Sequence, residues 1–384
     1  MTDSPKRCYV HVGLPKTGTS YLQSIFFQSQ DALARQDLTM LPGTTAATFH
    51  LHLDLRGQLR EGMDPRPAFT AMKRLPRQAA RVPTSRALMT QELFAGAGPK
   101  HVARLVEALP GWEIHLVITL RDLGRQLPSA WQQRIKARGL ESYPDFLAAA
   151  RAGRPSANAF WNHHDPVGVL ARWRTQVPSE RVHLVTVPPA GAPPDLLLKR
   201  FCSVLDVDPA TLTASTPDDN TSLGLVQAEV LRRVNVALGD RLPHPRAGYR
   251  RVGKGYLARH VLSPQRGTPP RLPAELEHWC METSRGWIDT LGGAGYHVVG
   301  DLTDLLPGDR SFTDVDQAVT DADVAGSAVD ALASILDTRL TELRDLDALR
   351  SQLADQAREL DVLRTRRREI VRRVLSRAGR VLPR

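Results

Sequence analysis

A lysine, a glycine and three hydroxyl side chains follow the first apolar segment of the chain. Residues 8–14 read CYVHVGL, which predicts a buried strand, and a helical pattern with one apolar face begins near Leu22. Between them lies the run Pro15-Lys16-Thr17-Gly18-Thr19-Ser20. A strand, a tight turn and a helix N-terminus can cradle a phosphate, because the first N–H groups of the helix are unpaired and its dipole favours an anion. We therefore expect residues 15–20 to bind phosphate, with Lys16 as a mobile cation.

The order of residues in this run differs from that of the common NTPase loop. That loop places its lysine directly after the second glycine, whereas Lys16 precedes Gly18 and Thr19 occupies the lysine position. The run therefore predicts a phosphate loop that is poorly suited to ATP. The alternative is a plain turn that caps a helix, since Thr and Ser are ordinary N-cap residues.

A second segment carries groups that could bind another phosphate. Residues 113–120 read EIHLVITL, which predicts a buried strand, and a helical pattern follows it. Arg121 stands at the end of this strand and Ser129 eight residues later, in the early turns of the helix. A guanidinium can hold a phosphate through two parallel hydrogen bonds, and a serine can donate a further one. The competing interpretation is a structural ion pair for Arg121 and a surface position for Ser129.

Together, the run 15–20 and the segment LRDLGRQLPSAWQQRIK resemble the two nucleotide-binding elements of sulfotransferases that use 3′-phosphoadenylyl sulfate (PAPS). The resemblance extends over most of residues 8–306. It implies that residues 15–20 hold the 5′-phosphosulfate, that Lys16 stabilises the leaving phosphate, and that Arg121 and Ser129 hold the 3′-phosphate. The segment around Lys254, GKGY, is similar to a basic stretch that closes over the 3′-phosphate in that family. The resemblance implies no metal.

Transfer of a sulfuryl group to an alcohol also needs a base, and Glu92 is the candidate. It lies just past the predicted strand 87–90, at the same sheet edge as the phosphate loop. Carbohydrate sulfotransferases of the Golgi type use a glutamate at a similar position, so the resemblance implies a hydroxyl acceptor on a saccharide or glycolipid. The alternatives are a helix-capping role for Glu92 and one of four histidines as the base, namely His50, His52, His163 or His164.

These side chains require a fold that brings them together. Predicted strands near 38–41, 87–90, 113–120, 181–187 and 297–299 alternate with helical patterns. This alternation predicts an α/β fold, a P-loop-type parallel sheet flanked by helices over residues 1–306, with ligands beyond the carboxyl ends of the strands. Residues 239–273, rich in Pro, Gly and Arg, predict a lid or loop.

Residues 307–384 predict a helical extension that becomes one long helix from about Asp314. Leucines at heptad spacing indicate a coiled coil, with a possible homodimer through residues 340–375. Residues 358–384 hold ten arginines against three acidic residues, which accounts for most of the net charge of +10. A basic amphipathic tail suits an anionic membrane surface, and a solvated helix face is the alternative.

The composition narrows the remaining choices. The three cysteines form no closely spaced pair, which suggests a reducing compartment and no zinc site. No signal segment or membrane span is evident, so the sequence predicts a cytoplasmic protein that does not bind nucleic acid. Two other classes stay open: a P-loop nucleotide kinase or NTPase, and a non-catalytic membrane-associated scaffold on a sulfotransferase fold.

Overall fold

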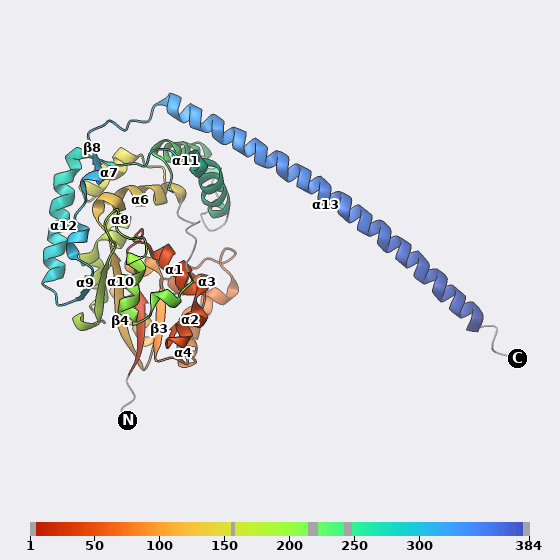
Figure 1. The fold of residues 1–384 in the computed structure, drawn as a ribbon, viewed down its shortest axis with the longest axis horizontal. Helices are drawn as coiled ribbons and strands as arrows, with labels where there is room; N and C mark the ends of the chain where they lie inside the picture. The colour runs from red at the N-terminus through yellow and green to blue at the C-terminus, as the bar shows by residue number, and fades with distance from the viewer. Residues whose placement is uncertain (1–4, 155–157, 214–221, 242–247, 379–384) are drawn as a thin grey trace. The chain divides into compact units, whose positions relative to one another are not determined.

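The computed structural model describes residues 5–154, 158–213, 222–241 and 248–378 (Figure 1). Its centre is a six-stranded sheet in which every pairing is parallel, in the order β2-β3-β1-β4-β5-β7. The strands of this sheet are β1 Lys6–His11, β2 Leu38–Met40, β3 Arg86–Thr90, β4 Trp112–Leu120, β5 Val182–Thr186 and β7 His297–Val299. The predicted parallel α/β sheet is confirmed.

Helices flank this sheet, and a long helix ends the described chain. One face of the sheet packs on a core to which α1, α2 and α10 contribute, including Leu22, Leu33 and Phe201. Figure 1 shows α9 and α12 on the other side of the sheet from α1 and α2. The α-helices are α1 Thr19–Gln28, α2 Gln30–Arg35, α3 Thr45–Leu55, α4 Ala71–Ala80, α5 Pro99–Glu107, α6 Leu123–Lys136, α7 Tyr143–Arg151, α8 Asn158–His164, α9 Pro166–Trp173, α10 Leu196–Leu205, α11 Leu225–Leu238, α12 Glu277–Gly292 and α13 Asp321–Ala378.

The register of the central strands decides which residues meet at the carboxyl edge. His11, the last residue of β1, lies opposite Thr90 of β3 and Val117 of β4. The segments after these three strands therefore emerge side by side, and β4 extends further than β1 along the same direction. The loop at 15–20, Glu92 and Arg121 all follow these strands, as the sequence predicted.

Two sequence predictions need correction. The segment 239–273, predicted as a lid or loop, contains the π-helix η8, Arg250–Leu262, within the residues described. Its glycines favoured a loop prediction, but buried side chains such as Val261 and Leu262 anchor a helix there. The final helix begins at Asp321, later than the predicted Asp314, because Phe312–Thr313 forms strand β8 and pairs with β6, Leu272–Pro273.

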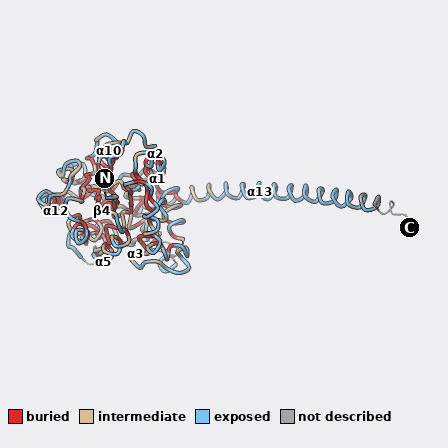
Figure 2. The backbone as a smooth tube through the Cα atoms, turned by 90° about the horizontal axis from the view of Figure 1, so that it is seen from below, coloured by how far each residue is buried: buried red, intermediate tan, exposed pale blue. Residues whose placement is uncertain are grey.

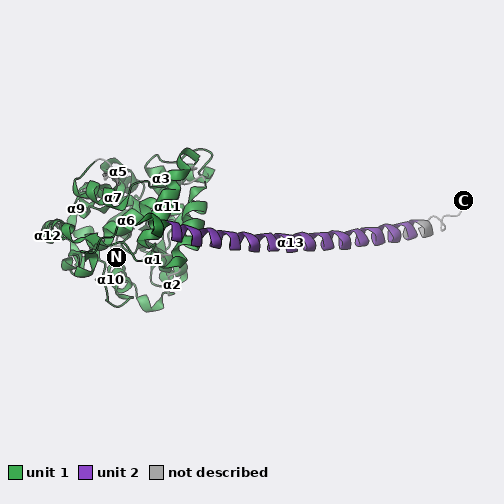
Figure 3. Cartoon of the chain, turned by 90° about the horizontal axis from the view of Figure 1, so that it is seen from above, with its two compact units in different colours: residues 1–324 green, residues 325–384 purple. Residues whose placement is uncertain are grey.

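The chain divides into two compact units, residues 1–324 and residues 325–384 (Figure 3). This boundary lies later in the chain than the predicted boundary at residue 306. The pairing of β6 with β8 keeps the segment after residue 306 with the first unit. The first unit has a buried core, whereas the described side chains of the second unit are largely exposed (Figure 2). None of the described helices is both long enough and apolar enough to cross a bilayer.

Candidate active site

The loop between β1 and α1 adopts a tight conformation that only certain residues allow. Gly13, Lys16 and Gly18 all have positive φ, of 49°, 71° and 85°. Residues other than glycine rarely adopt a positive φ, so the backbone of Lys16 carries strain of about 1–3 kcal/mol, of the kind stored at functional sites. A Cβ atom at Gly18 would come within 2.4 Å of the Leu197 side chain on α10. The glycine therefore lets α10 pack directly against the loop.

A chain of buried hydrogen bonds supports the loop from below. The Thr17 hydroxyl donates to the Leu14 carbonyl at 2.5 Å and lies 2.6 Å from the Thr119 hydroxyl. The ring of His11 lies between Thr119 (3.2 Å) and Thr90 (2.9 Å), which joins β1, β3 and β4. Since Thr17 uses its proton on Leu14, it must accept from Thr119, which in turn accepts from His11 Nε2. Burial lowers the pKa of His11 to about 3, which agrees with this neutral tautomer.

This chain limits what Thr17 can offer to a ligand. Thr17 belongs to the run expected to bind phosphate, but its hydroxyl proton is directed at the Leu14 carbonyl. Any contact of Thr17 with an anion would therefore come from its backbone N–H. Thr19 differs, since its hydroxyl is buried and has no partner among the described residues. An anion at the start of α1 would satisfy it, while Ser20 is exposed beside it.

Arg121 connects the loop with the second predicted phosphate site. Its Nη1 donates to the Lys16 carbonyl at 2.7 Å, and its buried Nε has no partner among the described residues. Burial, together with the charge of Arg125, lowers the pKa of Arg121 to about 10. A buried guanidinium with an unused N–H is suited to an anionic ligand.

Arg121 and Ser129 line one cavity of about 870 Å³. Asp122 places them, because it caps α6 by accepting from the Arg125 backbone N–H at 2.9 Å. Gly191, Ser222 and Arg271 line the same cavity from other parts of the chain. Its volume is in the range that holds a nucleotide-sized ligand. The structure thus brings together the two residues that the sequence assigned to a 3′-phosphate.

Glu92 lies against the phosphate loop. It is the first residue of the short 3₁₀ helix η2, Glu92–Gly96. The Gln91 N–H, just before this helix, donates to the His11 carbonyl at 3.0 Å and so holds the start of η2 beside the end of β1. A Cβ atom at Gly13 would be 3.5 Å from Cβ of Glu92. Burial raises the pKa of Glu92, and the charges of Lys16 and Lys254 oppose that rise. Burial thus favours the protonated form of this carboxyl, and the neighbouring lysines favour its charged form.

Three lysines from distant parts of the chain share this environment. Burial lowers the pKa of Lys16, Glu92 raises it, and Lys254 and Arg121 lower it further. Lys254, which the sequence predicted as a contact of the 3′-phosphate, belongs to η8, and its charge acts on both Lys16 and Glu92. Lys136, at the end of α6, was not predicted, and burial with the charges of Lys16 and Lys254 lowers its pKa to about 8. In the sequence it resembles any basic residue in a last helical turn.

Two of the four histidines that competed with Glu92, His52 and His164, are poor bases in this structure. Burial lowers the pKa of His52 to about 3, helped by Arg56, His163 and His101. Burial also lowers the pKa of His164 to about 3, helped by His163 and Lys16. Groups of such low pKa stay neutral but accept a proton weakly. Within the described ranges, His, Cys, Asp and Glu side chains form no group of three that could hold a metal ion.

Comparison with known proteins yields one structural similarity. No protein family profile matches the chain, and no curated protein matches it. Among solved structures, a sulfotransferase domain from the curacin biosynthetic pathway is similar over 67% of this chain and 99% of its own, with 12% sequence identity and a TM-score of 0.34. At this score the two structures share too little geometry for residues to be matched between them.

Proposed function

We propose that this protein is a sulfotransferase that moves the sulfuryl group of PAPS to a hydroxyl of a saccharide or glycolipid. The observation that carries the proposal is the position of Arg121, which contacts the Lys16 carbonyl and lines a cavity with Ser129. One arginine thus links the phosphate loop predicted from the sequence with the cavity proposed for the 3′-phosphate, which supports a nucleotide with phosphates at both ends. The Thr19 hydroxyl and Arg121 Nε, for which the described part of the chain supplies no hydrogen-bond partner, fit such a ligand.

In the proposed reaction, PAPS supplies the activated sulfuryl group. Glu92 accepts the proton of the acceptor hydroxyl as that oxygen attacks sulfur and the bond from sulfur to the 5′-phosphate oxygen breaks. Lys16 stabilises the negative charge that develops on the departing phosphate, in a partly dehydrated setting where such charges interact strongly. Because the groups are held by the same sheet edge, positioning contributes much of the rate. The products are a sulfate ester and adenosine 3′,5′-bisphosphate.

Calorimetry with adenosine 3′,5′-bisphosphate, AMP and Mg²⁺-ATP tests the proposal. We expect the bisphosphate to bind most tightly, with Arg121→Ala and Ser129→Ala removing its advantage over AMP, since both side chains are proposed to hold the 3′-phosphate, which AMP lacks. Lys16→Ala should weaken the binding of adenosine 3′,5′-bisphosphate and of AMP by about tenfold or more, because a charged contact is lost. Arg151→Ala, on the exposed end of α7, is the matched control and should change nothing.

Other results would identify other functions. Preference for Mg²⁺-ATP would indicate a kinase or NTPase. No binding of any nucleotide would indicate a scaffold. If Arg121→Ala and Ser129→Ala bind the bisphosphate as the wild type does, the 3′-phosphate site is wrongly assigned.

A further inference from the structure

Helix α13 carries a stripe of exposed leucines. Leu346, Leu349, Leu353, Leu360 and Leu363 are between 41% and 64% exposed. They are spaced by three or four residues, with Gln356 in the one remaining position of the series. This spacing keeps them on one side of the helix, in the a and d positions of a heptad repeat. A stripe of this kind on a long helix is an interaction surface.

The charges beside the stripe are arranged in complementary pairs. With Leu346, Leu353 and Leu360 at a, the g positions hold Asp345 and Glu359, and the e positions hold Arg350 and Arg364. In a parallel, in-register pair of helices, each g residue lies beside the e residue five positions further along the partner helix. Asp345 would then lie beside the partner's Arg350, and Glu359 beside the partner's Arg364. An antiparallel pair would instead place e beside e, which sets arginines against arginines.

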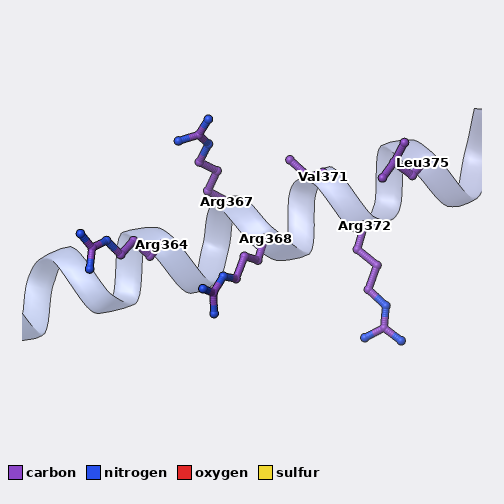
Figure 4. Close-up of a pocket in the computed structure, with 6 residues that line it drawn as sticks. All are labelled: Arg364, Arg367, Arg368, Val371, Arg372 and Leu375. Atoms are coloured by element: carbon purple, nitrogen blue, oxygen red, sulfur yellow. The ribbon is translucent and has the colours of Figure 1, made fainter.

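Polar residues interrupt the a and d series on both sides of residues 346–363, and Ile370, 61% exposed, resumes it at the next d position. Arg339 and Glu342 occupy the preceding a and d positions and pair within their own helix at 3.0 Å. Arg367 occupies the following a position, where it would face its own copy. From Arg364 onward one helix face is mostly basic, and Figure 4 shows its side chains on a single helix rather than around an enclosed site. Gln356 at d would meet its own copy, and a buried amide of this kind fixes register.

We propose that a second copy of this chain covers the stripe, as a parallel, in-register, two-stranded coiled coil over residues 345–364. The ion pairs seen inside the helix do not oppose this arrangement. Arg350 pairs with Asp347 at 3.3 Å, and both side chains are more than 70% exposed. Such exposed pairs contribute little to stability, so Arg350 can turn toward a partner helix at small cost. The inference is independent of the proposed enzymatic activity.

Sedimentation velocity on the full chain tests the assembly. We expect the wild type to be a dimer and the double variant Leu353→Glu/Leu360→Glu to be a monomer with unchanged helical circular dichroism. Val362→Glu is the control, because Val362 is also apolar and 52% exposed but lies off the stripe; it should remain a dimer. A monomeric or trimeric wild type, or a dimer that survives the double variant, overturns the proposal. If the wild type is a monomer that sediments with phosphatidylserine-containing vesicles but not with pure phosphatidylcholine vesicles, the proposal is overturned and the stripe binds a membrane surface instead.

Two further variants test the orientation. Leu349→Cys should form a disulfide-linked dimer on mild oxidation, because the native Cys8, Cys202 and Cys280 are buried and a parallel register places residue 349 beside its own copy. Glu359→Arg and Arg364→Glu should each weaken the dimer by roughly tenfold, since each creates like-charge contacts, and the double exchange should restore it. No crosslink at 349, or a double exchange as weak as the single variants, excludes the parallel arrangement.

Discussion

At the scale of single residues, the candidate site is defined by one carboxyl and several cations in the same environment. Burial pushes Glu92 toward its neutral form and Lys16 and Lys136 toward theirs, while the charge of Glu92 favours the charged form of Lys16. These effects oppose one another, so ligand binding can shift the proton balance of the whole group. Perturbed pKa values of this kind mark sites where protons move.

Glu92 should control the acidic side of the pH profile. A base must be deprotonated, and burial raises the pKa of Glu92 above its ordinary value of 4.5, so activity should fall with decreasing pH before ordinary carboxyl groups titrate. Glu92→Gln should reduce turnover by about 10²–10⁴-fold and leave bisphosphate affinity nearly unchanged. Turnover of PAPS with a saccharide and glycolipid fraction as acceptor measures the pH profile and the loss of activity in Glu92→Gln, and calorimetry measures the bisphosphate affinity. Full activity in Glu92→Gln would eliminate this residue as the base.

Lys136 should control the alkaline side. Its pKa of about 8 means that it is charged below that pH and neutral above it. If its charge supports the departing phosphate, activity should fall as pH rises through about 8. Lys136→Arg retains the charge to much higher pH and should move this limb upward, whereas Lys136→Met should lower activity below pH 8 as well. An alkaline limb unchanged in Lys136→Arg would show that another group titrates there.

At the scale of elements, the local pattern predicted the sheet well. Strand β4 was predicted almost to its ends, because a mostly apolar run, interrupted only by His115 and Thr119, matches a strand that is largely buried on both faces. Strand β1 ends at His11 rather than Leu14, since Gly13 turns the chain. Even so, the Val12 and Leu14 N–H groups still donate to β4 carbonyls, which holds the phosphate loop at the sheet edge.

The features of the candidate site that the sequence did not predict depend on packing between elements that are far apart in the chain. The environment of Lys136 depends on α6 and η8, which are more than a hundred residues apart in the chain. The hydrogen-bond chain through His11 depends on the register of three strands, and no spacing of residues in the sequence predicts that register. Arg121 and Ser129 were predictable because both lie on one continuous strand–helix segment. Residues on one local segment can be identified from sequence, whereas sites shared between elements need the fold.

At the scale of the whole molecule, the chain combines two units stabilised by different means. Residues 1–324 enclose a buried core, whereas α13 exposes most of its apolar side chains. The first unit should therefore respond to nucleotide and the second to protein concentration. A ligand stabilises only the state that binds it, by about 2.7 kcal/mol at a hundred times its dissociation constant. A dimer of helices, in contrast, melts at a temperature that rises with chain concentration.

We accordingly expect two separable thermal transitions by circular dichroism. Adenosine 3′,5′-bisphosphate should raise only the transition of the first unit, and in Arg121→Ala this shift should shrink to the shift that AMP produces, because the contact with the 3′-phosphate is lost. Increasing protein concentration should raise only the transition of α13, and this dependence should disappear in Leu353→Glu/Leu360→Glu. Each variant is the control for the other, since each should reduce or abolish one response and preserve the second. One cooperative transition that moves with both variables would show instead that the two units unfold together, and that the coiled coil is coupled to the nucleotide site.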